Sequence, residues 1–436
     1  MSVRRGWFFA SVARISHRHD RKLSEARGVL QSEPTVPFSP PSCISRSLRQ
    51  SVSLLLTLGL SISVSLLSCR PAAALTYNFT AVGNLADMIA GNQGVIQQTL
   101  GNQVAQGFQD AGDMWSNLLS DPVTANVDID FRNDLGAGVL GATNNITASG
   151  SYSAVRLALI ADALSADDAT AVANLQPGAG LEFLTNRRSD GAVIRANNTD
   201  AYANVLDVPR LNLKALGLIA GNDASTDGEI SFSSLFSWDF DHTNPITPGF
   251  DFVGVAAHEL GHLMGYFSGV DIVDLISNPN GPFKNTDLNG GLPGIGDATT
   301  FRVFSVLDLY RYSAASLAAS SQPSSGAVLD LAYGDTPYFS LNAGATNLGR
   351  FSTGSSNGDG RQASHWQDSL GLRLMDPTAA SGEFLTISNL DIRSMDAIGW
   401  NLASLAVPEP STLALAAAGL VVALVIGRTK KRWCGG

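Results

Sequence analysis

The sequence has 436 residues, of which 44% are hydrophobic and only 15% are charged, and its formal net charge is −10. The two ends are basic, whereas residues 71–427 between them hold 14 basic and 35 acidic side chains. A body this acidic repels phosphate backbones, which argues against nucleic acid as a partner, and the high apolar content excludes disorder throughout the chain.

Residues 1–74 are predicted to be a secretory signal peptide with a long basic n-region. An uncharged apolar run at 52–67 follows two arginines and precedes three alanines at 72–74, which form a small-residue cleavage site. A buried core helix is the alternative for this run, and lipidation at Cys69 is another. An upstream misassigned start codon would explain the unusual length of the n-region.

The body, residues 75–406, is predicted to be one catalytic domain that folds without disulfides. All three cysteines (Cys43, Cys69 and Cys434) lie outside it, so no thiol there can act as a nucleophile or metal ligand. A chain of about 330 residues can bury a sufficient core without crosslinks.

Hydrophobic periodicity predicts both helices and strands in this body. Helices are expected, in chain order, at 105–119, at 152–164 and at 165–175 with Ser165 as N-cap; a closing helix near 390–400 is implied by the resemblance described below. Half-buried strands are expected at 123–131, 181–184 and 228–233. The stretch 201–218 is mixed, and the stretches 276–300 and 344–360 are expected to be loops because they are rich in glycine and polar turn residues.

A helix predicted over 252–266 carries His258-Glu259-Leu260-Gly261-His262, an HExxH sequence. At about 3.6 residues per turn, the two histidines share one helix face and can reach one metal ion. Zinc favours nitrogen ligands with one open position for a water, and Glu259 can take a proton from that metal-bound water. The alternative is a core helix whose two histidines have ordinary hydrogen-bond partners.

The third metal ligand does not follow this motif directly. In most metzincins, a class of zinc proteases, the motif continues as HExxHxxGxxH. Gly265 fills the glycine position and could end the helix with a positive φ, but Ser268 stands at the next histidine position. Asp271, nine residues after His262, is a candidate for the third ligand, and His365 far downstream is another, since zinc accepts both carboxylate and imidazole.

The segment around His365 resembles the leishmanolysin-like branch of the metzincins. There a long insertion separates HExxHxxG from a His-Trp pair, and a turn containing a methionine, the Met-turn, follows. His365, Trp366 and Met375 match this order, so the resemblance implies that His365 is the third ligand and Met375 the Met-turn methionine. The resemblance covers roughly residues 225–400, and the chain lacks the many cysteines of the eukaryotic members.

The resemblance also implies a fold: an α+β, metzincin-like zincin with a mixed β-sheet, an active-site helix and a Met-turn C-terminal subdomain. The N-terminal subdomain would run to about 266 and the C-terminal subdomain over about 267–402. By analogy with metzincins, a peptide substrate would lie extended along an edge strand, for which 228–233 is the candidate.

Three further features leave alternatives open. His242 is expected to lie at the surface or beside the metal ligands, and Met375 could be an ordinary core methionine. Polar loops could hold structural calcium through oxygen ligands, although no ordered calcium-loop motif is present and solvated acids are the alternative. The loop residues concerned are Asp287, Asn289, Asp297, Asn357 and Asp359.

The C-terminal segment 407–436 has three parts in a fixed order. Pro-Glu-Pro at 408–410 is followed by an apolar run at 413–426 and a basic cluster at 428–432. This order resembles the PEP-CTERM sorting signal of Gram-negative bacteria, which an exosortase is thought to recognise and cleave. A plain membrane anchor is the alternative. Both place the body outside the cytoplasm, because the basic cluster stays inside, and the tail would hold the protein at the membrane until it is processed.

These observations predict an exported zinc-dependent endopeptidase, located in the outer envelope or outside a Gram-negative cell. It would hydrolyse peptide bonds of extracellular or envelope proteins through a metal-bound water activated by Glu259. Its HELGH, SGVD and DAIGW segments are similar to those of a bacterial group of exported metalloproteases with PEP-CTERM tails. The alternative is a non-catalytic envelope or exopolysaccharide-associated protein that keeps a zinc site for stability.

Overall fold

The structure, a computed structural model, describes most of the predicted body and two short N-terminal strands. The described residues are 3–4, 11–15, 74–187, 190–199, 203–246, 249–277, 304–320, 326–368 and 374–403. By their contacts they all belong to one unit. The apolar run of the signal peptide, the C-terminal tail and most of the loop predicted at 276–300 lie outside the described residues.

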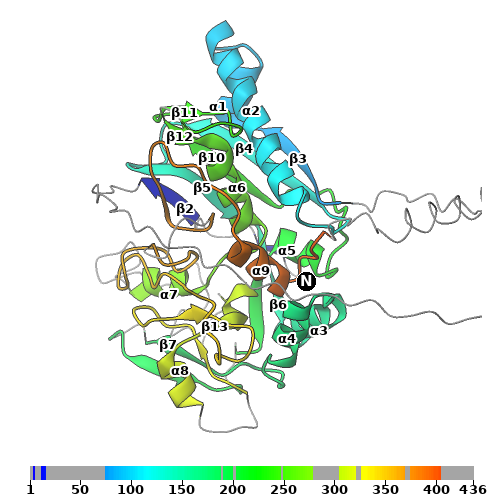
Figure 1. The fold of residues 1–436 in the computed structure, drawn as a ribbon, viewed down its shortest axis with the longest axis vertical. Helices are drawn as coiled ribbons and strands as arrows, with labels where there is room; N and C mark the ends of the chain where they lie inside the picture. The colour runs from blue at the N-terminus through cyan, green and yellow to red at the C-terminus, as the bar shows by residue number, and fades with distance from the viewer. Residues whose placement is uncertain are drawn as a thin grey trace, which may run out of the picture. The chain divides into compact units, whose positions relative to one another are not determined.

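A six-stranded mixed sheet is the frame on which the HExxH helix packs (Figure 1). In spatial order its strands are β17 (Thr378–Ala379), β2 (Ser11–Ile15), β5 (Val139–Asn145), β10 (Gly228–Ser233), β4 (Thr124–Arg132) and β3 (Thr76–Ala81). Strands β3, β4 and β10 run parallel to one another. Strand β5 is antiparallel to β10, β2 is antiparallel to β5, and β17 is parallel to β2.

Apolar side chains alternate along the central strands β4 and β10, although the serines between them in β10, Ser231 and Ser233, are buried as well. Val127 and Ile129 of β4 are 1% exposed, and Ile230 and Phe232 of β10 are fully buried. Successive side chains of a strand point to opposite faces, so this pattern places one face of each strand in the core. The strands predicted at 123–131 and 228–233 are therefore confirmed as β4 and β10.

The prediction that 228–233 forms an edge strand is wrong. Strand β10 is paired with β4 along one edge and with β5 along the other, so it has no free edge that could bind a peptide. The alternation in the sequence reports which face of a strand is buried and carries no information about which edges are paired. The strand that borders the parallel part of the sheet is β5, whose outer edge pairs with residues 11–15.

Two long helices pack against each other on the sheet: α2 (Val95–Ser116) and α6 (Phe252–Leu263). Trp115 of α2 is buried, and its indole N–H donates a 2.8 Å hydrogen bond to the carbonyl of Ala257 in α6. Helix α2 begins ten residues before the predicted helix because its first turn, at Val95 and Ile96, is exposed and carries no burial pattern. The short helix α1 (Gly83–Ile89) packs on α2 and β4.

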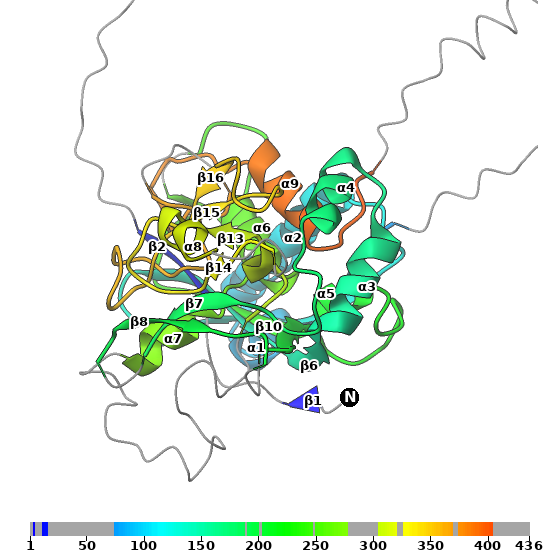
Figure 2. The same cartoon turned by 90° about the horizontal axis from the view of Figure 1, so that it is seen from below.

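Most of the other elements lie at the opposite end of the unit in Figure 1 and are seen from below in Figure 2. The helices are α3 (Tyr152–Asp162), α4 (Ala166–Ala173), α5 (Arg210–Ala215), α7 (Val270–Ser277), the 3-10 helix η2 (Leu307–Tyr310), α8 (Ala314–Ala319) and α9 (Asn389–Ala397). Three short sheets accompany them: β1 (Val3–Arg4), β6 (Thr147–Ser151) and β9 (Val205–Pro209); β14 (Leu329–Asp330), β7 (Phe183–Asn186) and β8 (Val193–Ala196); and β13 (Arg311–Tyr312), β15 (Tyr338–Phe339) and β16 (Gly349–Arg350). A two-stranded pair joins β11 (Trp238–Asp239) to β12 (Phe250–Asp251).

Most predicted elements are found, with small shifts at their ends. Helices α3 and α4 match 152–164 and 165–175, and Ser165 caps α4 through its hydroxyl as expected. Helix α9 matches the closing helix, and β7 begins two residues after the predicted strand at 181–184. The described residues therefore form a mixed α+β fold. None of the helices within them is long and apolar enough to cross a membrane.

Candidate metal centre

Helix α6 carries the HExxH sequence, and both of its ends are defined by specific residues. Its N-cap is Asp251, whose carboxylate accepts hydrogen bonds from the N–H groups of Gly254 (2.9 Å) and Leu385 (3.0 Å). His242 Nδ1 lies 2.9 Å from this carboxylate, so His242 supports the start of the helix and is not one of the clustered histidines. Gly265 follows the last turn with φ +119°, which confirms the expected helix end.

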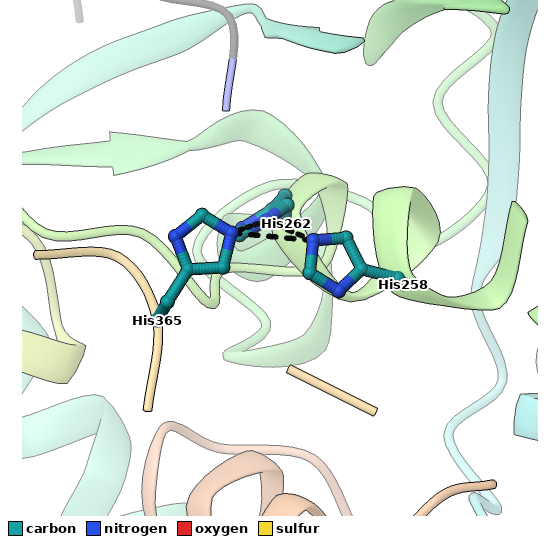
Figure 3. Close-up of side chains that lie close together, drawn as sticks. All are labelled: His258, His262 and His365. Atoms are coloured by element: carbon teal, nitrogen blue, oxygen red, sulfur yellow. Dashed lines mark hydrogen bonds between the residues drawn. The ribbon is translucent and has the colours of Figure 1, made fainter. Parts of the chain in front are cut away.

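The structure brings His258, His262 and His365 together, although His365 is 103 residues beyond His262. Their imidazole rings point toward one another, two from α6 and one from a loop (Figure 3). The Nε2 atom of His262 lies 3.0 Å from that of His258 and 3.2 Å from that of His365, and the third Nε2 pair is 3.3 Å apart. All three side chains are buried, with at most 2% of their surface exposed.

Each of the three rings has a backbone carbonyl next to its other nitrogen, Nδ1. The carbonyls belong to Leu374, Tyr266 and Gln362, and they lie 2.6, 2.6 and 3.3 Å from the Nδ1 atoms of His258, His262 and His365, respectively. A carbonyl can only accept, so Nδ1 must donate its hydrogen, and this fixes the tautomer. The lone pair of every Nε2 therefore faces the centre of the cluster.

Burial favours the neutral form of His258 and His262. It lowers the pKa of His258 to about 4, although the hydrogen bond to the Leu374 carbonyl opposes the shift. The pKa of His262 falls well below its usual value, first through burial and then through the neighbouring His258 and His365. In the tautomer set by the carbonyls at Nδ1, the three Nε2 atoms are all acceptors, and acceptors cannot hydrogen-bond with one another. A metal ion fits this donor set, because it satisfies all three lone pairs at once.

Asp271, the alternative third ligand, lies outside this group and instead holds the segment that carries His365. Its carboxylate accepts hydrogen bonds from the N–H of Ala363 (2.5 Å), from the N–H of Ser364 (3.1 Å) and from the Ser364 hydroxyl. Burial raises the pKa of Asp271 to about 7, although these hydrogen bonds oppose the shift. The aspartate nine residues after the motif thus fixes the backbone just before His365.

Ser268 shows how a distant histidine reaches the cluster. Its N–H donates a 2.8 Å hydrogen bond to the Ser364 hydroxyl, and its own hydroxyl donates to Asp308 at 2.6 Å. In the short metzincin motif, the third histidine would stand at position 268. Here position 268 lies beside Ser364, the residue preceding His365. Packing between the two loops thus brings a histidine from far along the chain to the place beside the motif.

Asp391 of α9 holds the neighbouring segments together. Its carboxylate accepts the indole N–H of Trp366 at 2.7 Å and the backbone N–H groups of Leu374 and Met375 at 3.1 and 3.4 Å. The Leu374 carbonyl in turn orients the ring of His258. Burial raises the pKa of Asp391, against the hydrogen bonds it accepts. One buried carboxylate thereby links the segment after His365 to the segment that orients a histidine of α6.

Met375 is fully buried against α6. A Cβ atom at Gly261 would lie only 2.6 Å from the Met375 sulfur, so the methionine can occupy this place because position 261 has no side chain. Gly261 stands between the two motif histidines, which explains a glycine inside a helix despite its cost of about 1 kcal/mol relative to alanine. Met375 therefore packs against the helix turn between His258 and His262, and its role as a Met-turn residue stays a prediction.

Glu259 has a partner that the sequence did not reveal. Its side chain is fully buried, and its Oε2 atom accepts a 2.7 Å hydrogen bond from the hydroxyl of Thr143 on β5. Strand β5 was not predicted, because five successive residues at its start are buried and the burial does not alternate. No local pattern in the sequence indicates Thr143.

Two of the five residues considered for calcium are described, and both make hydrogen bonds within the protein: Asn357 with helix α7, and Asp359 within its own loop. The Asn357 side chain donates to Asp274 at 2.9 Å, and Asp359 accepts the N–H groups of Thr353 and Arg361 at 3.1 Å each. The other three, Asp287, Asn289 and Asp297, lie outside the described residues.

Comparison with known proteins identifies the C-terminal tail. Residues 406–432 match the PEP-CTERM protein-sorting motif, as the order of Pro-Glu-Pro, apolar run and basic cluster predicts. The chain thus carries the C-terminal sorting signal of an exported protein that exosortase processes. No curated protein and no solved structure matches the chain.

Proposed function

We propose that this exported chain is a zinc-dependent endopeptidase in which His258, His262 and His365 hold the metal and Glu259 is the general base. The convergence of the three Nε2 atoms in a buried cluster, with Glu259 next to a ligand in the same helix, is the observation that carries the proposal. A structural zinc site usually has four protein ligands, whereas a catalytic site has three and an open position.

The spacing of the nitrogens supports zinc. Ligand nitrogens about 2.0–2.1 Å from a tetrahedral zinc ion lie about 3.3–3.4 Å from one another. The three Nε2 separations are 3.0, 3.2 and 3.3 Å, close to this requirement. When bound there, zinc would supply a Lewis acid for the peptide carbonyl and lower the pKa of a coordinated water to about 7.

The chemistry of the chain itself rests on Glu259. Its carboxylate would take a proton from the attacking water and then deliver it to the leaving amine of the peptide. The backbone carbonyls at Nδ1 would keep the histidine rings in the tautomer that binds the metal. The buried surroundings would exclude bulk water and so strengthen these electrostatic interactions.

The position of β2 supports an extended peptide as substrate. Residues 11–15 lie between β5 and β17, antiparallel to the first and parallel to the second. They belong to the predicted leader, so cleavage of the leader would free the outer edge of β5 for another strand. This replaces β10 with β5 as the proposed substrate-binding strand.

The substitution Glu259→Gln tests the proposal. It keeps the shape of the side chain but cannot accept a proton, so the purified protein should keep its zinc while hydrolysis of casein collapses. Metal analysis and a fluorogenic casein assay, with and without a chelator, give the two readouts. Full hydrolysis by Glu259→Gln would rule out this base. Zinc binding without any hydrolysis by the native protein would favour the non-catalytic, zinc-stabilised envelope protein instead.

A further inference from the structure

The side-chain hydroxyl of Thr143 contacts two atoms of a single residue, Glu259. The hydroxyl lies 2.7 Å from the Oε2 atom of Glu259 and 2.9 Å from the backbone carbonyl of Glu259. Thr143 is fully buried, in β5. A hydroxyl that contacts both the backbone and the carboxylate of one residue spans the rotatable bonds between them, so it restricts the side chain to one arrangement.

Gly141 closes the other side of this arrangement. A Cβ atom at position 141 would lie 3.0 Å from both Cγ and Oε1 of Glu259 and 3.1 Å from the ring of Phe232. Gly141 and Thr143 are two residues apart in one strand, so they share the face that packs on α6. Thr143 contacts one carboxylate oxygen while the Gly141 backbone leaves just enough room for the other.

In the ionised form in which Glu259 would act as a base, its carboxylate would accept a stronger hydrogen bond than a neutral group does. Thr185 of β7 offers a useful contrast, since it is also a fully buried strand threonine. Its hydroxyl has no hydrogen-bond partner within the described part of the chain. Burial of a threonine in a strand therefore does not by itself produce such a contact.

We infer that Thr143 is a positioning residue that, together with the space left at Gly141, holds the Glu259 carboxylate in its working orientation. The inference deepens the proposed function and rests on it, because the orientation matters for hydrolysis only if Glu259 is the base. The strand that orients the base is also the strand whose outer edge pairs with residues 11–15. Substrate pairing on that edge would hence be fixed to the same rigid element as the base.

Three variants and one control of the zinc-loaded protein, with the leader (residues 1–74) removed so that the outer edge of β5 is free, test this inference. Thr143→Val keeps the shape and removes the hydroxyl, so kcat should fall about 100-fold, as expected for a misplaced catalytic group, while KM and zinc content stay near their native values. Thr143→Ser keeps the hydroxyl and should retain most of kcat. Gly141→Ala should lower kcat as well, because the added methyl group displaces the carboxylate. Thr185→Val is the matched control and should leave kcat unchanged.

Two results would overturn the inference. One is a native kcat in Thr143→Val, and the other is an equal loss in Thr143→Ser, which would assign the effect to packing. A second readout does not require activity: the infrared carboxylate band of Glu259, isolated by subtracting the spectrum of Glu259→Gln, should shift in Thr143→Val and stay in place in Thr143→Ser. If the native protein shows no hydrolysis, the proposed function fails, and this band alone decides whether Thr143 contacts the carboxylate.

Discussion

The histidine cluster is assembled from two halves that are held by different forces. His258 and His262 stand one turn apart on α6, a helix whose residues are all buried and mostly apolar. His365 stands on a segment without helix or strand, and the buried carboxylates of Asp271 and Asp391 accept hydrogen bonds from the chain on either side of it. The helical half is fixed by local geometry. The loop half depends on buried carboxyl groups, whose unfavourable desolvation is offset only by the hydrogen bonds that they accept.

This difference has a consequence for stability. Burial raises the pKa of Asp271 to about 7 and also raises the pKa of Asp308 and Asp391. Arg311, which is fully buried, lies close enough to Asp271 and Asp308 to oppose both shifts. A buried charge that loses its partner is strongly destabilising. The loop half should therefore be the part of the site that mutation and pH disturb first.

The largest loss of zinc affinity should come from a substitution of His365, the proposed ligand in the loop half. His365→Ala removes one of three metal ligands, so zinc affinity should fall by orders of magnitude and hydrolysis should be lost with it. Zinc affinity is measured by competition with a chelator of known affinity. His242→Ala is the control, because His242 contacts Asp251 and not the cluster. Equal zinc loss in both variants would mean that the cluster does not bind the metal.

Asp271→Ala removes the acceptor of three hydrogen bonds beside His365 without removing a ligand. Zinc affinity should fall about 10-fold, the smaller end of what loss of a supporting hydrogen bond costs. Asp274→Ala is the matched control: Asp274 lies one turn further along α7, and its carboxylate accepts from residues 355–357 instead. Both variants should be less stable than the native protein, but only Asp271→Ala should bind zinc more weakly. If Asp271→Ala abolished zinc binding while His365→Ala did not, the aspartate would be the third ligand after all.

The support behind the loop half should titrate near neutral pH. Asp396 of α9 accepts a 2.5 Å hydrogen bond from the Ser165 hydroxyl of α4, and burial raises its pKa from 3.8 to about 7. The folded state therefore binds this proton more tightly than the unfolded state does. The resulting stability is fully present below pH 4 and is lost as the pH rises to 7, with a slope of at most about 1.4 kcal/mol per pH unit.

Asp396→Asn should flatten the dependence of unfolding free energy on pH between 4 and 7, as measured by urea denaturation. The control is Asp223→Asn. Hydrogen bonds with Ser225, and then the contact with Arg210, lower the pKa of Asp223 to about 2, so its contribution is present above pH 4 and is lost only in more acidic solution. An unchanged slope in Asp396→Asn would show that this carboxyl group does not titrate in the expected range.

The smallest loss of stability should come from a change at the contact between Met375 and Gly261 of α6. Met375→Leu preserves volume against α6 and should lower the free energy of unfolding by less than about 1.5 kcal/mol, with zinc retained. Gly261→Ala should cost more, because the new methyl group would lie 2.6 Å from the Met375 sulfur. Chemical denaturation of both variants makes the comparison. A larger loss in Met375→Leu than in Gly261→Ala would contradict this account of the contact.

The helical half could be predicted from the sequence, because its information is local. The i, i+4 spacing of His258 and His262 and the glycine at 265 indicate the ligand pair and the helix end without any tertiary knowledge. The place of His365 followed only from a resemblance. Asp271, predicted only as an alternative metal ligand, accepts backbone N–H groups instead; in the sequence a carboxylate near the motif looks the same in either role.

The sheet shows the same limit of sequence information. Alternating apolar residues predict β4 and β10, yet the free edge that a substrate needs is a property of pairing between distant strands. Thr143 reaches Glu259 across 116 residues, and the non-alternating burial of β5 hides the strand that carries it. Such contacts are set by register and packing, which no short window of sequence records.

The separation of His262 and His365 along the chain would make a metal bound by both a crosslink. The residues 75–406 contain no cysteine, so no disulfide can restrict their unfolded state. A metal ion bound by α6 and by His365 would close a loop of 103 residues, and in the chain-entropy view a covalent closure of that length is worth about 4.7 kcal/mol. For this exported protein, chelation should then act as reduction acts on a disulfide-bonded one: it would open the largest loop and lower the melting temperature together.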